Sequence, residues 1–487
     1  MELKGKSGDG VAEDNEVGEA EAGPMTTLHH QPGAVEQYGI EPIPPALRTV
    51  GWFDLFSIFI NFLINPGDII KAGLAVAAGL SVPMAILAQF VGTLLAIFFY
   101  VAMANVGVDY GVPGQVAART SFGIRGAKLL PSLLRLVVST YYFAFQTIVG
   151  SVAIMAVLEK LFAIKPPMLL VAILFGILQA GVALFGYDYL KRLSRLALPV
   201  KIVVLGYLFY VMASHPDPNF SPLHILHFTG TQTFTWLLLL TWLNTSITSW
   251  LSMTTDSADF CRYSSSRNQM WIGVFAATLI GTLITGLFGA YGAAATLGKD
   301  SNSFTVIANI HPTMTTLLAI LLVIGLDNWT INVLNLYTGG LSLNNIWGKL
   351  GRFWSTLIVS VFSIALCLVP DLLTDFLNYV GVIGTIFAPI SGILVFDYLL
   401  IRRMKVDVPA LYQAQSRYWY WHGFNPVAVM WMVIGFLLYM FVIPELWLKP
   451  LLTAVLTGAG YSLTYAAIHR SAMAKAIGLA DAPAPGG

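Results

Sequence analysis

The sequence predicts an all-α integral membrane protein with twelve transmembrane helices. Hydrophobic residues make up 56% of the chain and charged residues only 10%, and the mean hydropathy is +0.73, well beyond the range of soluble domains. Apolar runs recur at the length of about 20 residues that a helix needs to cross a bilayer. The net charge of +1 gives no indication of a nucleic-acid partner.

Twelve apolar runs define the expected helices. They cover residues 52–78, 82–106, 131–160, 166–187, 193–213, 233–255, 269–297, 314–337, 353–370, 375–400, 426–445 and 448–469. The fourth and fifth runs are separated by little more than DYLKRLSR, so we expect a tight helical hairpin there. Residues 1–38 are acidic and rich in Gly and Ala, which predicts a disordered tail without a cleavable signal, and residues 470–487 form a second tail.

The distribution of Lys and Arg predicts the orientation of the chain. The loops after the even-numbered runs hold Arg119, Arg125, Lys128, Lys191, Arg192, Arg195, Arg262, Arg267, Lys349, Arg352, Arg402, Arg403, Lys405 and Arg417. The opposite loops hold only Lys160, Lys165, Lys299 and Lys449. This asymmetry predicts that both termini lie in the cytoplasm and that the protein is a multi-pass protein of the plasma (inner) membrane.

The first run contains a predicted helix break, INFLINPGDIIKAG. Pro66 has no backbone N–H to donate and disfavours a helical conformation for Asn65. A broken helix at membrane depth is tolerated where it lines a cavity, and in transporters such breaks bind ions or substrates. Asp68 and Lys71, three residues apart, could neutralise each other, in which case the helix would only be kinked and would bind nothing.

The third and sixth runs carry polar and aromatic side chains together. Tyr142 and Gln146 are four residues apart on one helical face. The amide could bind a flat, amide-like ligand or simply a neighbouring helix. In the sixth run, Ser249 and Trp250 follow a hydroxyl-rich turn, and Trp250 lies too deep to act as an interfacial anchor.

The eighth run is interrupted by LDNWTINVLN at residues 326–335. Asn328, Asn332 and Asn335 form one polar stripe of a helix, and Asp327 lies on a neighbouring face. A single asparagine in a membrane helix could be explained by a hydrogen bond to a neighbouring helix, which contributes about 0.6 kcal/mol on average. Three asparagines and an acid predict a polar, hydrated pocket.

Other classes of membrane protein are less compatible with the sequence. The histidines that an intramembrane hydrolase would need lie mostly in loops, and no HExxH motif is present. Cys261 and Cys367 are too far apart to indicate a disulfide scaffold or a zinc site. The sequence shows neither a repeated pore-loop signature nor a ring of charges, so it does not indicate a channel. We therefore expect a transporter and not an enzyme.

Several motifs, in order along the chain, resemble those of the nucleobase–cation symporters, the permeases for purines, cytosine, uracil, allantoin, hydantoin and thiamine-type compounds. The motifs are GIEPIPPALRT at 39–49, YGVPGQVAARTSFGIRGAKLLPSLLR at 110–135, YYFAFQT at 141–147, W-x8-DFCRY at 250–263, NWTINVLNLYTGGLSL at 328–343, APISGILVFDYLLIRR at 388–403 and HGFNPVA at 422–428.

The resemblance implies a leucine-transporter-like fold with an inverted repeat of five plus five helices, in which helices 1 and 6 are interrupted. Residues 39–51 would form a cytoplasmic motif before the first helix, 52–213 and 233–400 the two repeats, and 426–469 two additional helices. The fold would act as a monomer.

The resemblance also implies a site for a small planar heterocycle. Trp250 and Tyr142 would enclose the ring, although many relatives have Trp at the second position. Gln146 and either Asn332 or Asn335 would bind the polar edge, with Ser249 nearby. The expected function is import of a nucleobase or related heterocycle by cation symport through alternating access. Carriage of another small solute, an amino acid or a vitamin precursor, is the alternative.

No cofactor is expected beyond a coupling ion, H⁺ or Na⁺. In relatives that use sodium, the resemblance implies ligands from the first helix, here the carbonyls of Phe62 and Asn65. The eighth helix would contribute Asp327, Thr330 and Ile331. Ile331 stands where sodium users often have a hydroxyl, and Asp327 adds a carboxylate where a neutral residue is usual. An acid can replace a sodium ligand or carry a proton itself, and we favour the proton.

Overall fold

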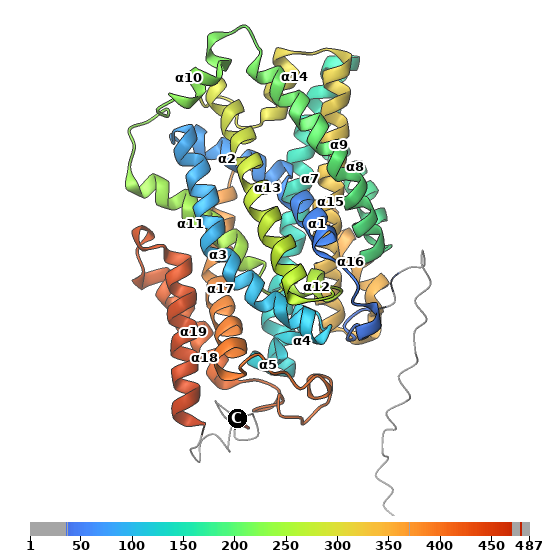
Figure 1. Ribbon diagram of the computed structural model, residues 1–487, viewed down its shortest axis with the longest axis vertical. Helices are drawn as coiled ribbons and strands as arrows, with labels where there is room; N and C mark the ends of the chain where they lie inside the picture. The colour runs from blue at the N-terminus through green and yellow to red at the C-terminus, as the bar shows by residue number, and fades with distance from the viewer. Residues whose placement is uncertain (1–35, 37, 370, 470–477, 480–487) are drawn as a thin grey trace, which may run out of the picture.

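The computed structural model describes residues 36, 38–369, 371–469 and 478–479, and this part of the chain is helical without β-strands (Figure 1). The principal helices are α1 (Trp52–Leu63), α2 (Pro66–Ala77), α3 (Val82–Tyr110), α7 (Leu133–Phe162), α8 (Met168–Ala183), α9 (Tyr187–Ala213), α11 (Trp236–Ser252), α13 (Arg267–Ala295), α15 (Met314–Ile346), α16 (Gly351–Leu366), α17 (Phe376–Phe396), α18 (Pro426–Leu437) and α19 (Lys449–Ile468). The short helices are α4 (Gly114–Ala117), α5 (Arg119–Phe122), α6 (Ile124–Ala127), α10 (Pro222–Leu226), α12 (Ser257–Cys261) and α14 (Ser303–Ile310).

These helices confirm the predicted fold class. Eight helical spans in the described part are long and apolar enough to cross a membrane, and α1 with α2 makes a ninth. Met168–Ala183 and Pro426–Val442 are shorter apolar helices. Each of the twelve expected runs coincides with one helix or with one broken pair. The sixth run contains α11, and α12 follows directly after it.

The first span is broken where Pro66 predicts it. α1 ends at Leu63, α2 begins at Pro66, and the two helices are bent by 47°. Asn65 caps α2, because its side-chain oxygen accepts a hydrogen bond from the backbone N–H of Asp68 at 2.9 Å. The break is therefore a local consequence of the Asn-Pro sequence, which ends one helix and starts another.

The sixth span is also broken, between Ser252 at the end of α11 and Ser257 at the start of α12. α11 packs against α3 and α17, whereas α12 packs against α3 and α4. α7 and α15 lie along each other, and α15 also contacts α1, α8 and α9. The break in α1–α2 therefore lies beside the α7–α15 pair.

The two ends of the bundle differ (Figure 1). α10 and α14 lie at one end, and α4 and α5 lie at the other. α18 and α19 pack together at the side of the bundle, against α17. Of the expected tails at 1–38 and 470–487, the structure describes only residues 36, 38, 478 and 479.

Glu36 connects the segment before α1 to three later parts of the chain. Its carboxylate accepts hydrogen bonds from Tyr263 at 2.7 Å, Tyr337 at 2.9 Å and Arg262 at 3.1 Å. Its backbone carbonyl accepts a hydrogen bond from Arg352 at 3.2 Å. One acidic side chain thus fixes this segment to the residues that follow α12, to α15 and to α16.

Candidate substrate cavity and cation site

A buried cavity of about 70 Å³ lies beside the break between α1 and α2. Its walls come from α1, α2, α3, α7, α11, α12, α15 and α17. The expected site residues that line it are Phe62, Asn65, Tyr142, Gln146, Ser249, Trp250, Ile331 and Asn335. The structure therefore brings together aromatic and amide side chains from four of the interrupted or polar runs.

Trp250 is held in a fixed orientation. Its indole N–H donates a hydrogen bond to the hydroxyl of Thr93 on α3 at 3.1 Å, and the side chain is buried. Phe62 and Tyr100 contact the indole edge-to-face, with ring centroids at 6.2 and 5.5 Å. Such contacts restrict ring rotation, so Trp250 offers the cavity a rigid aromatic surface.

Aromatic rings also line the cavity from α7 and α17. Tyr142 lies one helical turn before Gln146, and its ring packs against Tyr141 at 5.3 Å. Phe145 and Phe376 stack at 4.9 Å and connect α7 to the start of α17. Aromatic side chains therefore reach the cavity from α7 and α17 as well as from α11.

Gln146 binds the helix break and also lines the cavity. Its amide oxygen accepts a hydrogen bond from the backbone N–H of Gly67 at 2.8 Å, and its amide nitrogen donates to Asn65 at 2.7 Å. A Cβ atom at Gly67 would lie only 2.4 Å from that nitrogen, so glycine is needed for this approach. Gln146 thus makes the bond to a neighbouring helix that the sequence analysis considered, and it also lines the cavity.

The ion pair expected in the first span is present at the cavity wall. Lys71 lies 2.6 Å from Asp68, and Asp68 also accepts a hydrogen bond from Asn65 at 2.8 Å. The Lys71 side chain is almost fully buried, whereas the Asp68 side chain is 26% exposed. The cavity wall thus carries a neutralised pair of charges.

Only Asn335 of the asparagine stripe reaches the cavity. Its amide donates a hydrogen bond to Asn332 at 3.1 Å. Asn332 is fully buried behind it, where it donates to Thr147 at 3.0 Å and contacts Gln179. Asn328 donates only to a carbonyl of its own helix at 3.4 Å. Asn332 therefore supports Asn335 and does not line the cavity.

A second ion pair, which the sequence did not predict, also lines the cavity. Arg135 on α7 lies 2.7 Å from Asp256 in the break between α11 and α12, and both side chains are buried. Arg135 also donates a hydrogen bond to the carbonyl of Ser252 at 3.2 Å. Asp256, just after the sixth run, is visible in the sequence as an acid beside an apolar segment, but its partner Arg135 comes from a distant helix.

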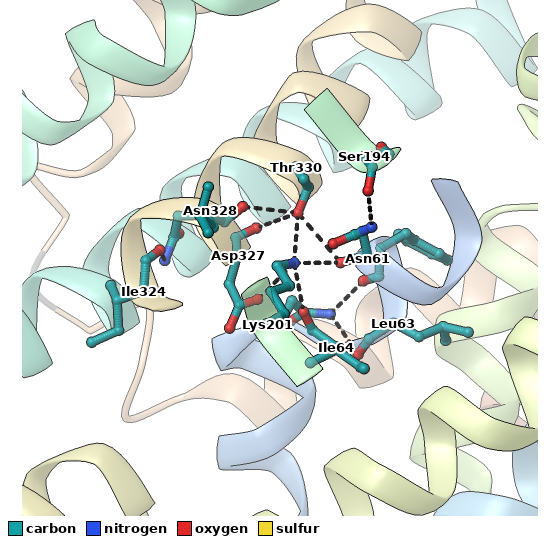
Figure 2. Close-up of polar contacts among 12 residues, drawn as sticks. Asn61, Leu63, Ile64, Ser194, Lys201, Ile324, Asp327, Asn328 and Thr330 are labelled. Atoms are coloured by element: carbon teal, nitrogen blue, oxygen red, sulfur yellow. Dashed lines mark hydrogen bonds and ion pairs between the residues drawn. The ribbon is translucent and has the colours of Figure 1, made fainter. Parts of the chain in front are cut away.

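A separate cluster of oxygens surrounds Lys201 where α1, α9 and α15 meet (Figure 2). The Lys201 ammonium lies 2.6 Å from the carboxylate of Asp327 and 2.9 Å from the hydroxyl of Thr330. It also donates to the carbonyls of Asn61 and Ile64 at 3.2 and 3.3 Å. The side chains of Lys201 and Asp327 have no exposed surface.

The expected cation residues divide between this cluster and the cavity. Asp327 and Thr330 belong to the cluster, whereas Phe62 and Ile331 line the cavity. The carbonyl of Phe62 accepts a hydrogen bond from Asn65. The carbonyls that face the cluster are those one residue earlier, at positions 61 and 64, because the chain turns at the break.

Sequence reasoning missed Lys201. The available signal was a lone lysine in LPVKIVVLG, an apolar stretch of the fifth run. A lysine at membrane depth needs a partner, and Asp327 is that partner. Within the described part of the chain, no group of three or more His, Cys, Asp or Glu side chains could hold a metal ion, and Cys261 and Cys367 are free and buried.

Comparisons with known proteins identify the family of the chain. The family model described as "Permease for cytosine/purines, uracil, thiamine, allantoin" matches residues 42–465. The purine-uracil permease of Arabidopsis thaliana is 27% identical over 428 residues, which cover 81% of this chain and 69% of that protein. The hydantoin permease of Microbacterium maritypicum is 25% identical over 411 residues, which cover 80% of this chain and 81% of that protein.

Solved structures show the same fold. Mhp1, a nucleobase-cation-symport-1 family transporter in a closed conformation with bromovinylhydantoin bound, has a TM-score of 0.77 at 21% identity, covering 92% of this chain and 97% of that chain. A Na⁺-coupled sialic acid symporter has a TM-score of 0.61 at 10% identity, covering 86% and 90%. The protein is a membrane transporter and not an enzyme, and it belongs to the family of permeases for cytosine, purines, uracil, thiamine and allantoin.

Proposed function

We propose that this permease imports a small planar heterocycle, a nucleobase or a related ring such as allantoin or hydantoin, by cation symport. The observation that supports this most directly is the cavity beside the helix break. There Trp250 and Tyr142 provide aromatic surfaces, and Gln146 and Asn335 provide amides. The related permeases are named for purines, uracil and hydantoin, which are all planar rings with a polar edge.

The two kinds of side chain have different tasks. Stacking of a base on an aromatic side chain contributes about 1–3 kcal/mol and tolerates many rings. The amides instead distinguish the donors and acceptors of the ring edge, because a mismatched edge leaves a buried polar group without a partner. Trp250 therefore provides affinity, and Gln146 and Asn335 provide selectivity among rings.

The alternative, an amino acid or another zwitterion, is less compatible with the helix break. A carboxylate substrate would need free backbone N–H groups at the start of α2. The N–H of Gly67 is bonded to Gln146, and the N–H of Asp68 is bonded to Asn65. Because these donors are already used within the protein, we favour a neutral ring.

We propose that the coupling cation acts where α1 meets α15, and that it is a proton and not sodium. The buried carboxylate of Asp327 supports this choice, because it gives the site a negative charge that the positive charge of a transported proton can neutralise. One monovalent cation that enters down a potential of 100 mV supplies about 2.3 kcal/mol, enough for about a fiftyfold gradient of a neutral solute.

The charge distribution supports an orientation in the plasma membrane. The end of the bundle with α4 and α5 carries most of the loop Lys and Arg residues, so we propose that this end and both termini lie in the cytoplasm. We also propose that a single chain is the functional unit.

Binding and uptake of a panel of rings test the substrate class. The panel contains cytosine, uracil, a purine, allantoin and hydantoin, with leucine and thiamine to represent the alternative solutes. We expect at least one planar ring to saturate uptake, and we expect Trp250→Ala to weaken its binding about 5- to 150-fold, which corresponds to the loss of one stacking contact.

The matched control is Trp271→Ala. Trp271 on α13 also donates its indole N–H to a neighbouring helix, at Asn105, but it does not line the cavity. We expect this variant to bind as the wild type does. Equal affinities in the wild type and Trp250→Ala, or selective uptake of leucine, would contradict the proposed site.

A further inference from the structure

Lys201 is surrounded by the kind of ligands that a monovalent cation would have. Four oxygens lie within 3.3 Å of its ammonium: one carboxylate, one hydroxyl and two backbone carbonyls. Three N–H groups of one ammonium face these four acceptors, so every donor has a partner. Figure 2 shows that the oxygens approach the nitrogen from α1 on one side and from α15 on the other.

The cluster has no net charge while Lys201 is protonated and Asp327 is ionised. Asp327 is the one group in charge contact with Lys201 among the described residues, and neither carboxylate oxygen of Asp327 has a further hydrogen-bond donor there. A buried ammonium opposite a buried carboxylate has no net charge. Removal of the ammonium's proton would leave an uncompensated carboxylate in a site without exposed surface.

The other helices packed against α9 add no charge to this site. α8 and α14 contain no Asp, Glu, Lys, Arg or His, and Asp327 is the only such residue of α15. On α1, Asp54 pairs with Arg195, two turns before Lys201 on α9. The protonation of the cluster is therefore a property of the Lys201–Asp327 pair.

The ammonium also connects two parts of the fold. The carbonyls of Asn61 and Ile64 belong to the end of α1, next to the cavity, whereas Asp327 and Thr330 belong to α15. A positive charge between them holds the end of α1 against α15. Without that positive charge, the carbonyl oxygens of α1 and the carboxylate of Asp327 would repel one another.

We propose that the Lys201 ammonium is the cation of this site, and that the coupled ion is a proton which Lys201 binds and releases opposite Asp327. This inference rests on the proposed function, because it assigns the coupling ion of the same transport cycle. Sodium has no place in the site while the ammonium occupies it.

The proton step is simple. When the site opens to water on the loading side, the lone pair of the neutral Lys201 amine takes a proton from hydronium. One O–H bond of the hydronium breaks, an N–H bond forms, and a water molecule leaves. On the opposite side that N–H bond breaks, the nitrogen keeps the electron pair, and the proton leaves to water. In the loaded state the pair is neutral and can be closed off, whereas in the unloaded state the carboxylate must stay hydrated. This charge requirement couples closure to proton binding.

Sodium ions alone provide the first test. The thermal stability of the purified full-length protein is measured in NaCl and in choline chloride at equal ionic strength and constant pH. We expect no sodium-dependent shift for the wild type. We expect a sodium-dependent stabilisation for Lys201→Ala, because that variant leaves the four oxygens and an open volume, and we expect no such shift for Lys201→Ala combined with Asp327→Asn. Stabilisation of the wild type by sodium, or no response of a folded Lys201→Ala protein, would overturn the inference.

Uptake into proteoliposomes provides the second test and does not depend on a folded Lys201→Ala variant. With one-proton coupling, an outside pH one unit more acidic supports about tenfold accumulation of a panel ring without sodium. Accumulation driven only by a sodium gradient would contradict proton carriage by Lys201 and would leave the proposed substrate class intact. Failure of every ring, together with the expected sodium responses, would contradict the substrate class and leave the assignment of Lys201 intact.

Discussion

Two ion pairs of this protein have side chains with no exposed surface, yet their surroundings differ. Lys201–Asp327 lies between α1 and α15, and Arg402–Asp397 lies at the end of α17. The Asp397 carboxylate also accepts hydrogen bonds from Tyr461 at 2.9 Å and from Ser121 at 3.1 Å. Among the residues that the structure describes, the Asp327 carboxylate has Lys201 as its one partner.

The cations of the two pairs also differ, both in their number of partners and in their ability to release a proton. Arg402 also donates to the carbonyl of Thr120 and contacts the hydroxyl of Tyr420, and its guanidinium stays protonated under all physiological conditions. Lys201 can release its proton. A fixed charge with several hydrogen-bond partners stabilises the fold, whereas an exchangeable charge with one acidic partner can take part in a transport cycle.

The largest expected effect comes from removal of each acid. Asp397→Ala would leave the Arg402 guanidinium buried and charged, which should lower the free energy of unfolding by about 3–5 kcal/mol. Asp327→Ala should cost less, because Lys201 can become neutral. In that variant the folded state lacks a proton that the unfolded state binds, so stability should rise with pH.

Denaturant titration of both variants in detergent micelles between pH 6 and pH 9 measures this difference. Equal losses of stability in the two variants, with no dependence on pH for Asp327→Ala, would show that the two pairs have the same role.

Exchange of the two cations should have a smaller but more specific effect. Lys201→Arg keeps the positive charge but cannot release a proton, so the roughly tenfold accumulation expected at a gradient of one pH unit should fall to none. Arg402→Lys should keep that accumulation. The measurement is uptake of a panel ring into proteoliposomes, and equilibrium binding of the ring controls for folding. Accumulation by Lys201→Arg would exclude the proton step proposed for the lysine.

The smallest expected effect concerns one hydroxyl. Thr330→Val removes an acceptor 2.9 Å from the Lys201 ammonium and should reduce proton-driven uptake about fivefold, which corresponds to about 1 kcal/mol for one hydrogen bond. Thr278→Val is the control, because Thr278 on α13 is equally buried and bonds only to its own helix. A similar loss of initial uptake rate in both variants would indicate a general effect on helix packing.

The sequence was sufficient for the fold because each span is a local signal. A run of about 20 apolar residues predicts a membrane helix wherever it occurs, and Asn65-Pro66 predicts a break from two adjacent residues. The polar positions in the third, sixth and eighth runs also indicated where a cavity would form. Trp250, Gln146 and Asn335 do line one cavity in the structure, although their contact with a substrate stays a prediction.

The remaining features of the site depend on contacts between distant segments. Lys201 and Asp327 are 126 positions apart, and nothing in either local sequence identifies the other as its partner. The carbonyls of Phe62 and Asn65 were expected as sodium ligands, whereas the carbonyls that face Lys201 are those of Asn61 and Ile64. The end of α1 decides which carbonyls turn inward. Asn332 and Asn335 share a helical face, and the structure shows that Asn335 lines the cavity while Asn332 bonds to Thr147 on α7.

Glu36 has a practical consequence for work with this protein. It lies near the start of the described chain, yet its carboxylate neutralises Arg262 and binds two tyrosines of distant segments. A shortened version that begins after this residue would leave the Arg262 guanidinium without its acid. Purification tags and fluorescent fusions are therefore better attached at the far C-terminal end, and a truncated N-terminus should be treated as a mutation of the transporter.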